Sequence, residues 1–420
     1  MHLEQNSSPF FPQERHFTGK IIFNTLFNIV FNNGIYDMIL AQMDNLFLKK
    51  FFSKISELMA NAEDSAVGID IGSSAIKVVE IKKKKGRIIL ETYGAIALGP
   101  YDALDVGRVT NLPVEKTAEA LKEVLKQSRV DVVSGAFSIP VQSSLIFNIE
   151  LPITVKDTEM TTVISTEARK YIPVPITEVS LDYFILPQKE SSFEEMNANN
   201  SNIPQKTAEK TNVLVVATQN SVISKYRSVV SLCSLTASFF EIEIFSSVRA
   251  NFEHELSPVL LMDFGASRTK LSIVEFGMVK NYHTIERGGA DITDSISKSL
   301  SIPFSEAEKM KKEFGLFGNP AEKSLSDIIK IHIDYIFSET NSALLGYEKK
   351  YNKTISKVIF TGGGSLLKGL TETAANNFRA QIEIGHPFNK VNAPEFLGKV
   401  LETMGPEFAV ALGLALRKLQ

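Results

Sequence analysis

The chain contains 420 residues, of which 44% are hydrophobic and 22% are charged. This length predicts two to four domains and is sufficient for a large core without disulfides. The single cysteine, Cys233, excludes a disulfide framework and a multi-cysteine metal site, and it is typical of a reducing compartment. The formal net charge of −3 gives no global positive field, so the composition predicts no nucleic-acid partner.

Residues 1–64 differ in character from the rest of the chain. The apolar run over residues 21–31 is interrupted by polar residues and is shorter than the roughly 20 residues of a transmembrane helix. From Leu46 to Met59 apolar residues recur at helical spacing among lysines, which predicts an amphipathic helix. Such a helix packs on its own domain or a partner, or it lies on a membrane surface. Met43 is an alternative translation start.

The first of two similar strand–turn–strand segments follows directly. Asp70 ends an apolar strand, Gly72 permits close approach of the backbone, and Ser73 and Ser74 supply N–H and hydroxyl donors. Lys77, seven residues after Asp70, is placed to neutralise a terminal phosphate. A turn of this composition can hold a phosphate through backbone dipoles.

The second segment repeats this pattern 193 residues later. Asp263 ends the apolar strand 259–262, and the turn that follows contains Gly265, Ala266 and Ser267 before a further strand at 271–275. Repetition of one device at this distance predicts an internal duplication. The two turns are then expected to face each other across a cleft.

A third glycine-bearing element lies near the C-terminus. A strand over residues 358–361 is followed by Gly362, Gly363, Gly364 and Ser365, and then by a helix. Three glycines without side chains let the backbone lie flat against a planar base or a sugar. Together, the three elements predict a nucleotide-binding cleft.

The order and spacing of these turns resemble the actin-like ATPase superfamily, which includes actin, Hsp70, hexokinase, MreB and FtsA. The resemblance implies an α/β fold, the two-lobed actin-like (ribonuclease H-like) fold, with ATP and Mg²⁺ as cofactors. By the same resemblance, Asp70 and Asp263 hold Mg²⁺, the residues of the two turns cradle the phosphates, and Lys77 contacts the terminal phosphates. The triple glycine then contacts the nucleoside.

Further residues match superfamily elements that cross the cleft. Glu243 matches a catalytic acid that orients water for attack on the γ-phosphate, although the residue pattern alone also fits a solvent-facing glutamate at a strand end. Gly288 and Gly289 match the second connecting segment. Glu308 and Lys311 match helix residues that meet the ribose and base, and otherwise they belong to a solvated helix face.

Within the superfamily, the sequence resembles the PilM family of type IV pilus assembly. The most specific segment is Glu167–Ile176, with the pattern E-x-x-K-Y-I-P-x-P-I. Glu241 departs from the family, which usually has Asp at this position. The resemblance is carried by five stretches: 67–80, 137–152, 166–175, 214–218 and 408–417.

The same resemblance divides the chain into subdomains, including an inserted 1C subdomain of the FtsA and PilM type. The expected parts are the extension 1–64, subdomain 1A in 65–144, 213–256 and 405–420, subdomain 1C in 145–212, subdomain 2A in 257–300 and 355–404, and subdomain 2B in 301–354.

In function, the resemblance implies a cytoplasmic ATP-binding protein at the inner-membrane platform of pilus assembly. Its implied partner is the N-terminal cytoplasmic peptide of a PilN-like inner-membrane protein, and a homo-oligomer is a further option. ATP binding and slow hydrolysis would act as a conformational switch, with the protein held at the membrane periphery by its partner or by its N-terminal helix. Two alternatives stay open: an FtsA-like membrane-tethered filament or cell-division scaffold, and a small-molecule kinase of the same fold.

Overall fold

The computed structural model describes residues 64–152, 157–186, 210–253, 255–319, 322 and 324–419. These residues fall within one compact unit, Asp64–Gln420. The amphipathic helix expected between Leu46 and Met59 lies outside the described residues. Within the described ranges, no helix is long and apolar enough to cross a membrane.

The first sheet has five strands in the order β3-β2-β1-β4-β8. The first three strands run antiparallel, because each is joined to the next by a tight turn, and the other two run parallel to β1. The turn between β2 and β3 contains Lys85 and Gly86 in left-handed conformation, as a tight hairpin turn requires. The strands are β1 (Asp64–Ile71), β2 (Ala75–Lys84), β3 (Arg87–Ala97), β4 (Ser134–Ile139) and β8 (Thr236–Ile242).

Helices cover both faces of this sheet because alternate strand residues are apolar on each face. One face carries α4 (Val114–Gln127) and α7 (Asn220–Leu232), which bury Val67, Ile69 and Phe137. The other face carries α14 (Ala409–Leu419), which buries Ala66 and Val79. The apolar stretch at the C-terminus is therefore a helix packed within the first lobe.

The second sheet repeats the strand order and directions of the first, in the order β11-β10-β9-β12-β13. Three antiparallel strands are again followed by two parallel ones, and this shared topology confirms the internal duplication. The strands are β9 (Val259–Phe264), β10 (Thr269–Glu275), β11 (Met278–Ile285), β12 (Lys357–Thr361) and β13 (Gln381–Ile384).

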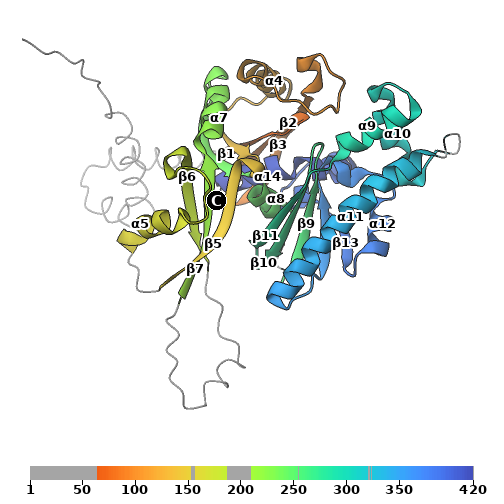
Figure 1. The fold of residues 1–420 in the computed structure, drawn as a ribbon. Coiled ribbons are helices and arrows are strands. Elements are labelled where there is room, and N and C mark those ends of the chain that lie inside the picture. The colour runs from red at the N-terminus through yellow and green to blue at the C-terminus, as the bar shows by residue number, and fades with distance from the viewer. Residues whose placement is uncertain are drawn as a thin grey trace, which may run out of the picture. The chain divides into compact units, whose positions relative to one another are not determined.

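Helices of the second lobe surround a core that contains Phe264, Phe337 and Phe360. The long helix α11 (Ser324–Tyr351) lies beside the second sheet in Figure 1. On the opposite face, α8 (Glu243–Asn251) packs Ile244 and Val248 against Leu261 and links the two sheets. The remaining helices are α9 (Gly289–Leu300), α10 (Phe304–Phe314), α11 (Ser324–Tyr351), α12 (Leu370–Asn377) and α13 (Gly398–Met404).

A third, smaller sheet forms the inserted subdomain, with strands in the order β5-β7-β6. The strands are antiparallel, and α5 (Asp157–Ala168) packs on them through Met160 and Ile164. The sheet extends beyond the insert expected at 145–212, because β7 continues to Gln219 and pairs with both neighbours from Val213 to Thr218. Its strands are β5 (Ser144–Pro152), β6 (Val179–Ile185) and β7 (Lys210–Gln219).

Candidate functional site

A cavity of about 1090 Å³ lies where the β1–β2 turn, the β9–β10 turn and the glycines after β12 meet. Its walls also include residues of α7, α8, α9 and α10, of the loop before α4, and of the segment where α14 begins. The two turns come from corresponding places in the two sheets, so the duplication itself creates the cavity. The expectation that the turns share one cleft is met.

The two turns have the same backbone geometry. The Gly72 N–H donates to the Ala75 carbonyl at 3.0 Å, and the Gly265 N–H donates to the Arg268 carbonyl, also at 3.0 Å. A Cβ at either glycine would lie 3.0 Å from that carbonyl oxygen. Glycine therefore allows the tight turn, and the residues that follow it line the cavity.

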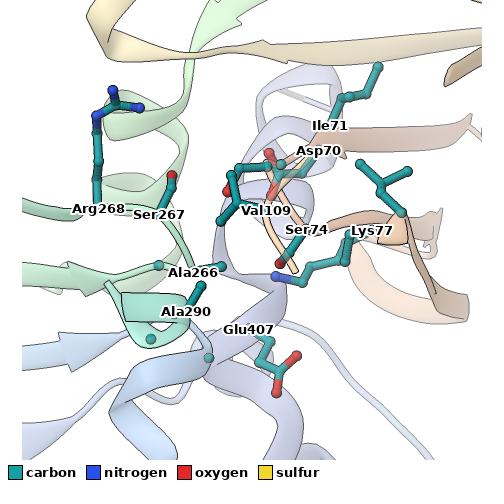
Figure 2. Close-up of a pocket in the computed structure, with 18 of the residues that line it drawn as sticks. Asp70, Ile71, Ser74, Lys77, Val109, Ala266, Ser267, Arg268, Ala290 and Glu407 are labelled. Atoms are coloured by element: carbon teal, nitrogen blue, oxygen red, sulfur yellow. The ribbon is translucent and has the colours of Figure 1, made fainter. Parts of the chain in front are cut away.

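Lys77 is an uncompensated cation in this cavity. It lies directly opposite Asp70 in the β1–β2 register. Among the described residues it has no hydrogen-bond or ion-pair partner, and it lines the cavity. Figure 2 shows its amino end directed across the cavity toward Ala266 and Ala290, which belong to the second lobe. A cation in this position has room for an anion beside it.

Asp70 lies at the bottom of the same cavity and is 8% exposed. The Ser138 hydroxyl donates to Asp70 Oδ1 at 2.7 Å, and Ser138 Oγ accepts the Ile71 N–H at 3.2 Å. Ser138 at the end of β4 thus fixes the orientation of the Asp70 carboxylate. Sequence reasoning did not select Ser138, because it lies 68 residues from Asp70.

Lys270 lies between two of the carboxylates expected at the site. Its Nζ is 3.0 Å from Asp263 Oδ2 and 2.6 Å from Glu243 Oε2, and the side chain is 14% exposed. Burial alone lowers the pKa of Lys270, but Asp263 and Glu243 outweigh it and raise the pKa above its usual value. Lys270 is therefore a permanent cation that bridges β9 and α8.

Glu243 is held through both of its carboxylate oxygens. It is the first residue of α8, and its Oε1 accepts the Val141 N–H at 3.0 Å, while Oε2 binds Lys270. Burial raises the pKa of Glu243, and the charge of Lys270 acts in the opposite direction. The alternative of a solvent-facing glutamate does not hold, because this side chain is buried and lines the cavity.

Glu308 and Lys311 of α10 form a polar cluster at the far wall of the cavity. Lys311 Nζ donates to Glu308 at 2.7 Å, to Thr293 at 2.7 Å and to the Gly289 carbonyl at 2.9 Å. Although burial would raise the pKa of Glu308, the Lys311 charge and hydrogen bond lower it below the usual value. These two residues are 13% and 12% exposed, so they do not belong to a solvated helix face.

The glycines after β12 approach the second turn closely. Gly362 has φ of +80°, and a Cβ there would lie 2.4 Å from Asp263 Oδ1. A Cβ at Gly364 would lie 2.4 Å from the Phe264 ring. Side chains at these positions would displace the β9–β10 turn, so the triple glycine positions that turn and leaves a flat backbone wall beside it.

Two of the residues expected at the site do not line the cavity. Gly288 packs against the backbone of Ala266 and begins α9, with its N–H donating to Asp291 at 2.8 Å. Ser365 is 1% exposed, and its hydroxyl donates to the Gly362 carbonyl at 2.6 Å. Both support the turns from behind. The other expected residues line it: Asp70, Gly72, Ser73, Ser74, Lys77, Glu243, Asp263, Gly265, Ala266, Ser267, Gly289, Glu308, Lys311, Gly362, Gly363 and Gly364.

Sequence reasoning missed two cavity residues that matter for its chemistry. Lys270 stands seven residues after Asp263, at the spacing that marks Lys77 after Asp70, so the duplication carried a signal for it. Ser247, one turn after Glu243 in α8, has a buried hydroxyl without a hydrogen-bond partner among the described residues. A serine inside a helix gives no such signal in the sequence.

The cavity fits a nucleotide in size and charge. Six basic and five acidic side chains line it, and the free Lys77 faces two turns that present backbone donors. Within the described ranges, no group of three or more His, Cys, Asp or Glu residues could hold a metal ion. Asp263 is paired with Lys270, and Asp70 accepts from Ser138, so the arrangement does not fit a Mg²⁺ ion between the two aspartates.

Comparison with known proteins supports this architecture. The model of the family described as "Type IV pilus assembly protein PilM" matches residues 68–419. Among solved structures, a "PilM-PilN type IV pilus biogenesis complex" superposes with a TM-score of 0.70 at 24% identity, covering 84% of this chain and 98% of that one. The expected two-lobed actin-like α/β fold is thereby confirmed.

Among curated relatives, the chain matches cell division proteins. FtsA of Staphylococcus epidermidis is 25% identical over 368 residues, which cover 79% of this chain and 76% of FtsA. FtsA of Neisseria meningitidis is 22% identical over 356 residues, which cover 75% and 81% of the two chains.

Proposed function

The chain belongs to the family of the type IV pilus assembly protein PilM, and from this premise we propose that it is an ATP-binding switch that engages a PilN-like inner-membrane partner. ATP would occupy the cavity between the two glycine turns. Slow hydrolysis would return the switch to its starting state, and the partner would hold the protein at the periphery of the inner membrane.

One observation carries the nucleotide proposal. The two duplicated turns face a single cavity, and the unpaired Lys77 ammonium points into the space between them (Figure 2). Backbone N–H groups in tight turns form anion-binding concavities, and a nearby lysine acts as a point charge on phosphate. The β- and γ-phosphates would therefore lie between Ser74 and Ala266.

The far wall of the cavity would hold the nucleoside. Glu308 offers carboxylate acceptors beside Lys311 and would contact the ribose. The flat backbone of Gly363 and Gly364 gives the base a surface without side chains. Glu243 would orient water for hydrolysis, and its engagement by Val141 and Lys270 accounts for a slow reaction.

Contacts across the cleft would couple the nucleotide to the two lobes. Arg108, in the loop after β3, is 2.5 Å from Asp294 of α9 and lies over the Phe304 ring at 3.9 Å. ATP bound between the turns would add contacts to both lobes and favour this closed arrangement. A ligand shifts such an equilibrium only through contacts that differ between the two states.

The third sheet offers a surface for the partner peptide. Phe184 and Ile185 of the edge strand β6 are 58% and 42% exposed, on opposite faces of the strand. An extended peptide can add to a sheet edge and place alternate side chains on such apolar residues. The PilN-like peptide is therefore proposed to bind along β6.

Calorimetry of the full chain with Mg·ATP tests nucleotide binding. Lys77→Ala should weaken binding by about 10- to 100-fold, because a charge-assisted contact with phosphate contributes about 1.5–3 kcal/mol. Lys83→Ala is the matched control, since Lys83 is exposed on the same strand. Absence of saturable binding, or equal affinity of the two variants, would refute the proposed site.

Fluorescence anisotropy with a labelled N-terminal peptide of a PilN-like protein tests the partner surface. Phe184→Asp should weaken peptide binding at least tenfold, because it places a charge in an apolar contact of the edge strand. Phe276→Asp, at a similarly exposed phenylalanine in the turn between β10 and β11, should leave it unchanged. An equal effect of both substitutions would place the peptide elsewhere.

A further inference from the structure

Two lysines occupy equivalent places in the two halves of the site. Lys77 lies opposite Asp70 in the β1–β2 register, and Lys270 lies opposite Asp263 in the β9–β10 register. Each lysine follows its aspartate by seven residues, as the duplication requires. Their surroundings differ, because Lys77 faces the open cavity while Lys270 is engaged by carboxylates.

The Lys270 ammonium sits among three carboxylates from three elements. Asp263 ends β9, Glu243 begins α8, and both are within 3.0 Å of Nζ. Asp70 of β1 is near enough to act electrostatically on both Lys270 and Glu243. These side chains are nearly buried, so the carboxylates depend on this one cation for compensation.

A divalent metal would need the same location. Asp70 and Asp263 are the residues expected to hold Mg²⁺, and the space beside Asp263 is taken by Lys270. Entry of a metal would displace a buried ammonium from two ion pairs and bring two positive ions together. The cation required between these carboxylates is therefore already part of the chain.

On the basis of the proposed ATP binding, we propose that the Lys270 ammonium takes the place of a divalent metal at this site, so that ATP binds without Mg²⁺. Lys270 keeps the Asp263 and Glu243 carboxylates from repelling the phosphates. Lys77 and the N–H groups of the two turns then neutralise the triphosphate directly. Lys270 acts through these carboxylates and is a positioning residue.

The test measures ATP affinity of the full chain by calorimetry, in Mg²⁺ buffer and in EDTA. For the unaltered chain we expect the two dissociation constants to agree within tenfold. For Lys270→Ala, which opens the space between the carboxylates, we expect EDTA to weaken binding by more than tenfold. Lys270→Arg retains the charge and should restore metal-independent binding. Lys298→Ala, at an exposed lysine of α9, is the control and should behave as the unaltered chain.

The outcomes separate this inference from the nucleotide site itself. If the unaltered chain binds ATP with Mg²⁺ but loses more than tenfold in EDTA, the role of Lys270 is refuted while ATP binding stands. If Lys270→Ala binds equally in both buffers, Lys270 is likewise not the replacement for the metal. If the unaltered chain binds in neither buffer, the proposed function fails and this inference fails with it. The comparison in the unaltered chain decides the matter even if Lys270→Ala does not fold.

Discussion

Replacement of glycine by alanine should have opposite effects on stability at Gly413, where α14 crosses α8, and at Gly346. At Gly413 in α14, a Cβ would lie 1.9 Å from the Ser246 carbonyl oxygen of α8. Ordinary contact begins near 3.4 Å, so the two helices would have to separate by about 1.5 Å. On the other side, α14 lies close against β1, where a Cβ at Gly68 would lie 1.8 Å from the Ala411 carbonyl oxygen. The helix therefore has no free direction in which to move.

Gly413→Ala should accordingly destabilise the protein at the upper end of the range for overpacking, about 3 kcal/mol. Gly346→Ala should do the reverse. Gly346 is exposed inside α11, a Cβ there meets nothing within 4 Å, and alanine favours a helix over glycine by about 1 kcal/mol. Thermal unfolding of both full-length variants measures the contrast. An unchanged Tm for Gly413→Ala would refute the close packing of α14, and a fall in Tm for Gly346→Ala would contradict the open surroundings of Gly346.

Three further predictions concern the site and its supports. Glu243→Gln should retain ATP affinity and reduce phosphate release at least tenfold, because an amide cannot accept the proton of water; equal turnover in a phosphate-release assay would exclude the role. Arg108→Ala should speed nucleotide release about fivefold in stopped-flow measurements, because the loss of its contacts with Asp294 and Phe304 amounts to roughly 1 kcal/mol; an unchanged rate would show that this contact does not retain the nucleotide. Burial alone would raise the pKa of Glu241, but Arg249 lowers this pKa overall. The ionised Glu241 carboxylate therefore stabilises the fold above the usual pKa of 4.5, and this stabilisation is lost as the pH falls through the lower pKa of Glu241 in the folded state. Urea midpoints at pH 7 and pH 3.5 should therefore differ less in Glu241→Gln than in the unaltered chain, and an equal difference would contradict this.

The sequence predicts the site well where its signals are local. Asp70, Gly72 and Lys77 lie within one hairpin, so their arrangement follows from the strand register and a turn that only glycine accommodates easily. The same reasoning predicts how Asp263 and Gly265 are arranged in the second hairpin. The repeat between the hairpins then predicted that they share a cavity, and the matching strand orders of the two sheets explain why they do.

Predictions from sequence were weaker where distant segments meet. Ser138 reaches Asp70 only because β4 pairs with β1, and Val141 reaches Glu243 across 102 residues. Glu241 departs from the usual aspartate of the family, and its two arginine partners, Arg249 and Arg417, come from α8 and α14. No local pattern encodes such partners, because pairing of strands and packing of helices decide them.

The boundary of the inserted subdomain shows a second limit. Apolar residues of β7 continue beyond residue 212 without a turn signal, so the sequence alone offers no reason to assign Val213 to Gln219 to the third sheet. The pairing of β7 with β5 on one side and with β6 on the other places these residues in the third sheet. The stretch 408–417, one of the five that carry the resemblance to the PilM family, lies largely in α14. Within it, Gly413 has no side chain and so permits the close contact of α14 with α8.

Photolabelling of the full chain with 2-azido-ATP, followed by peptide mapping, tests most directly whether a nucleotide lies between the duplicated turns. The base is expected to lie near α10 and the glycines after β12, so the label should be recovered in peptides containing Lys311 or Gly363. Excess ATP should prevent this labelling. Label recovered from segments that do not line the cavity, or labelling that ATP does not suppress, would contradict a nucleotide site at this place.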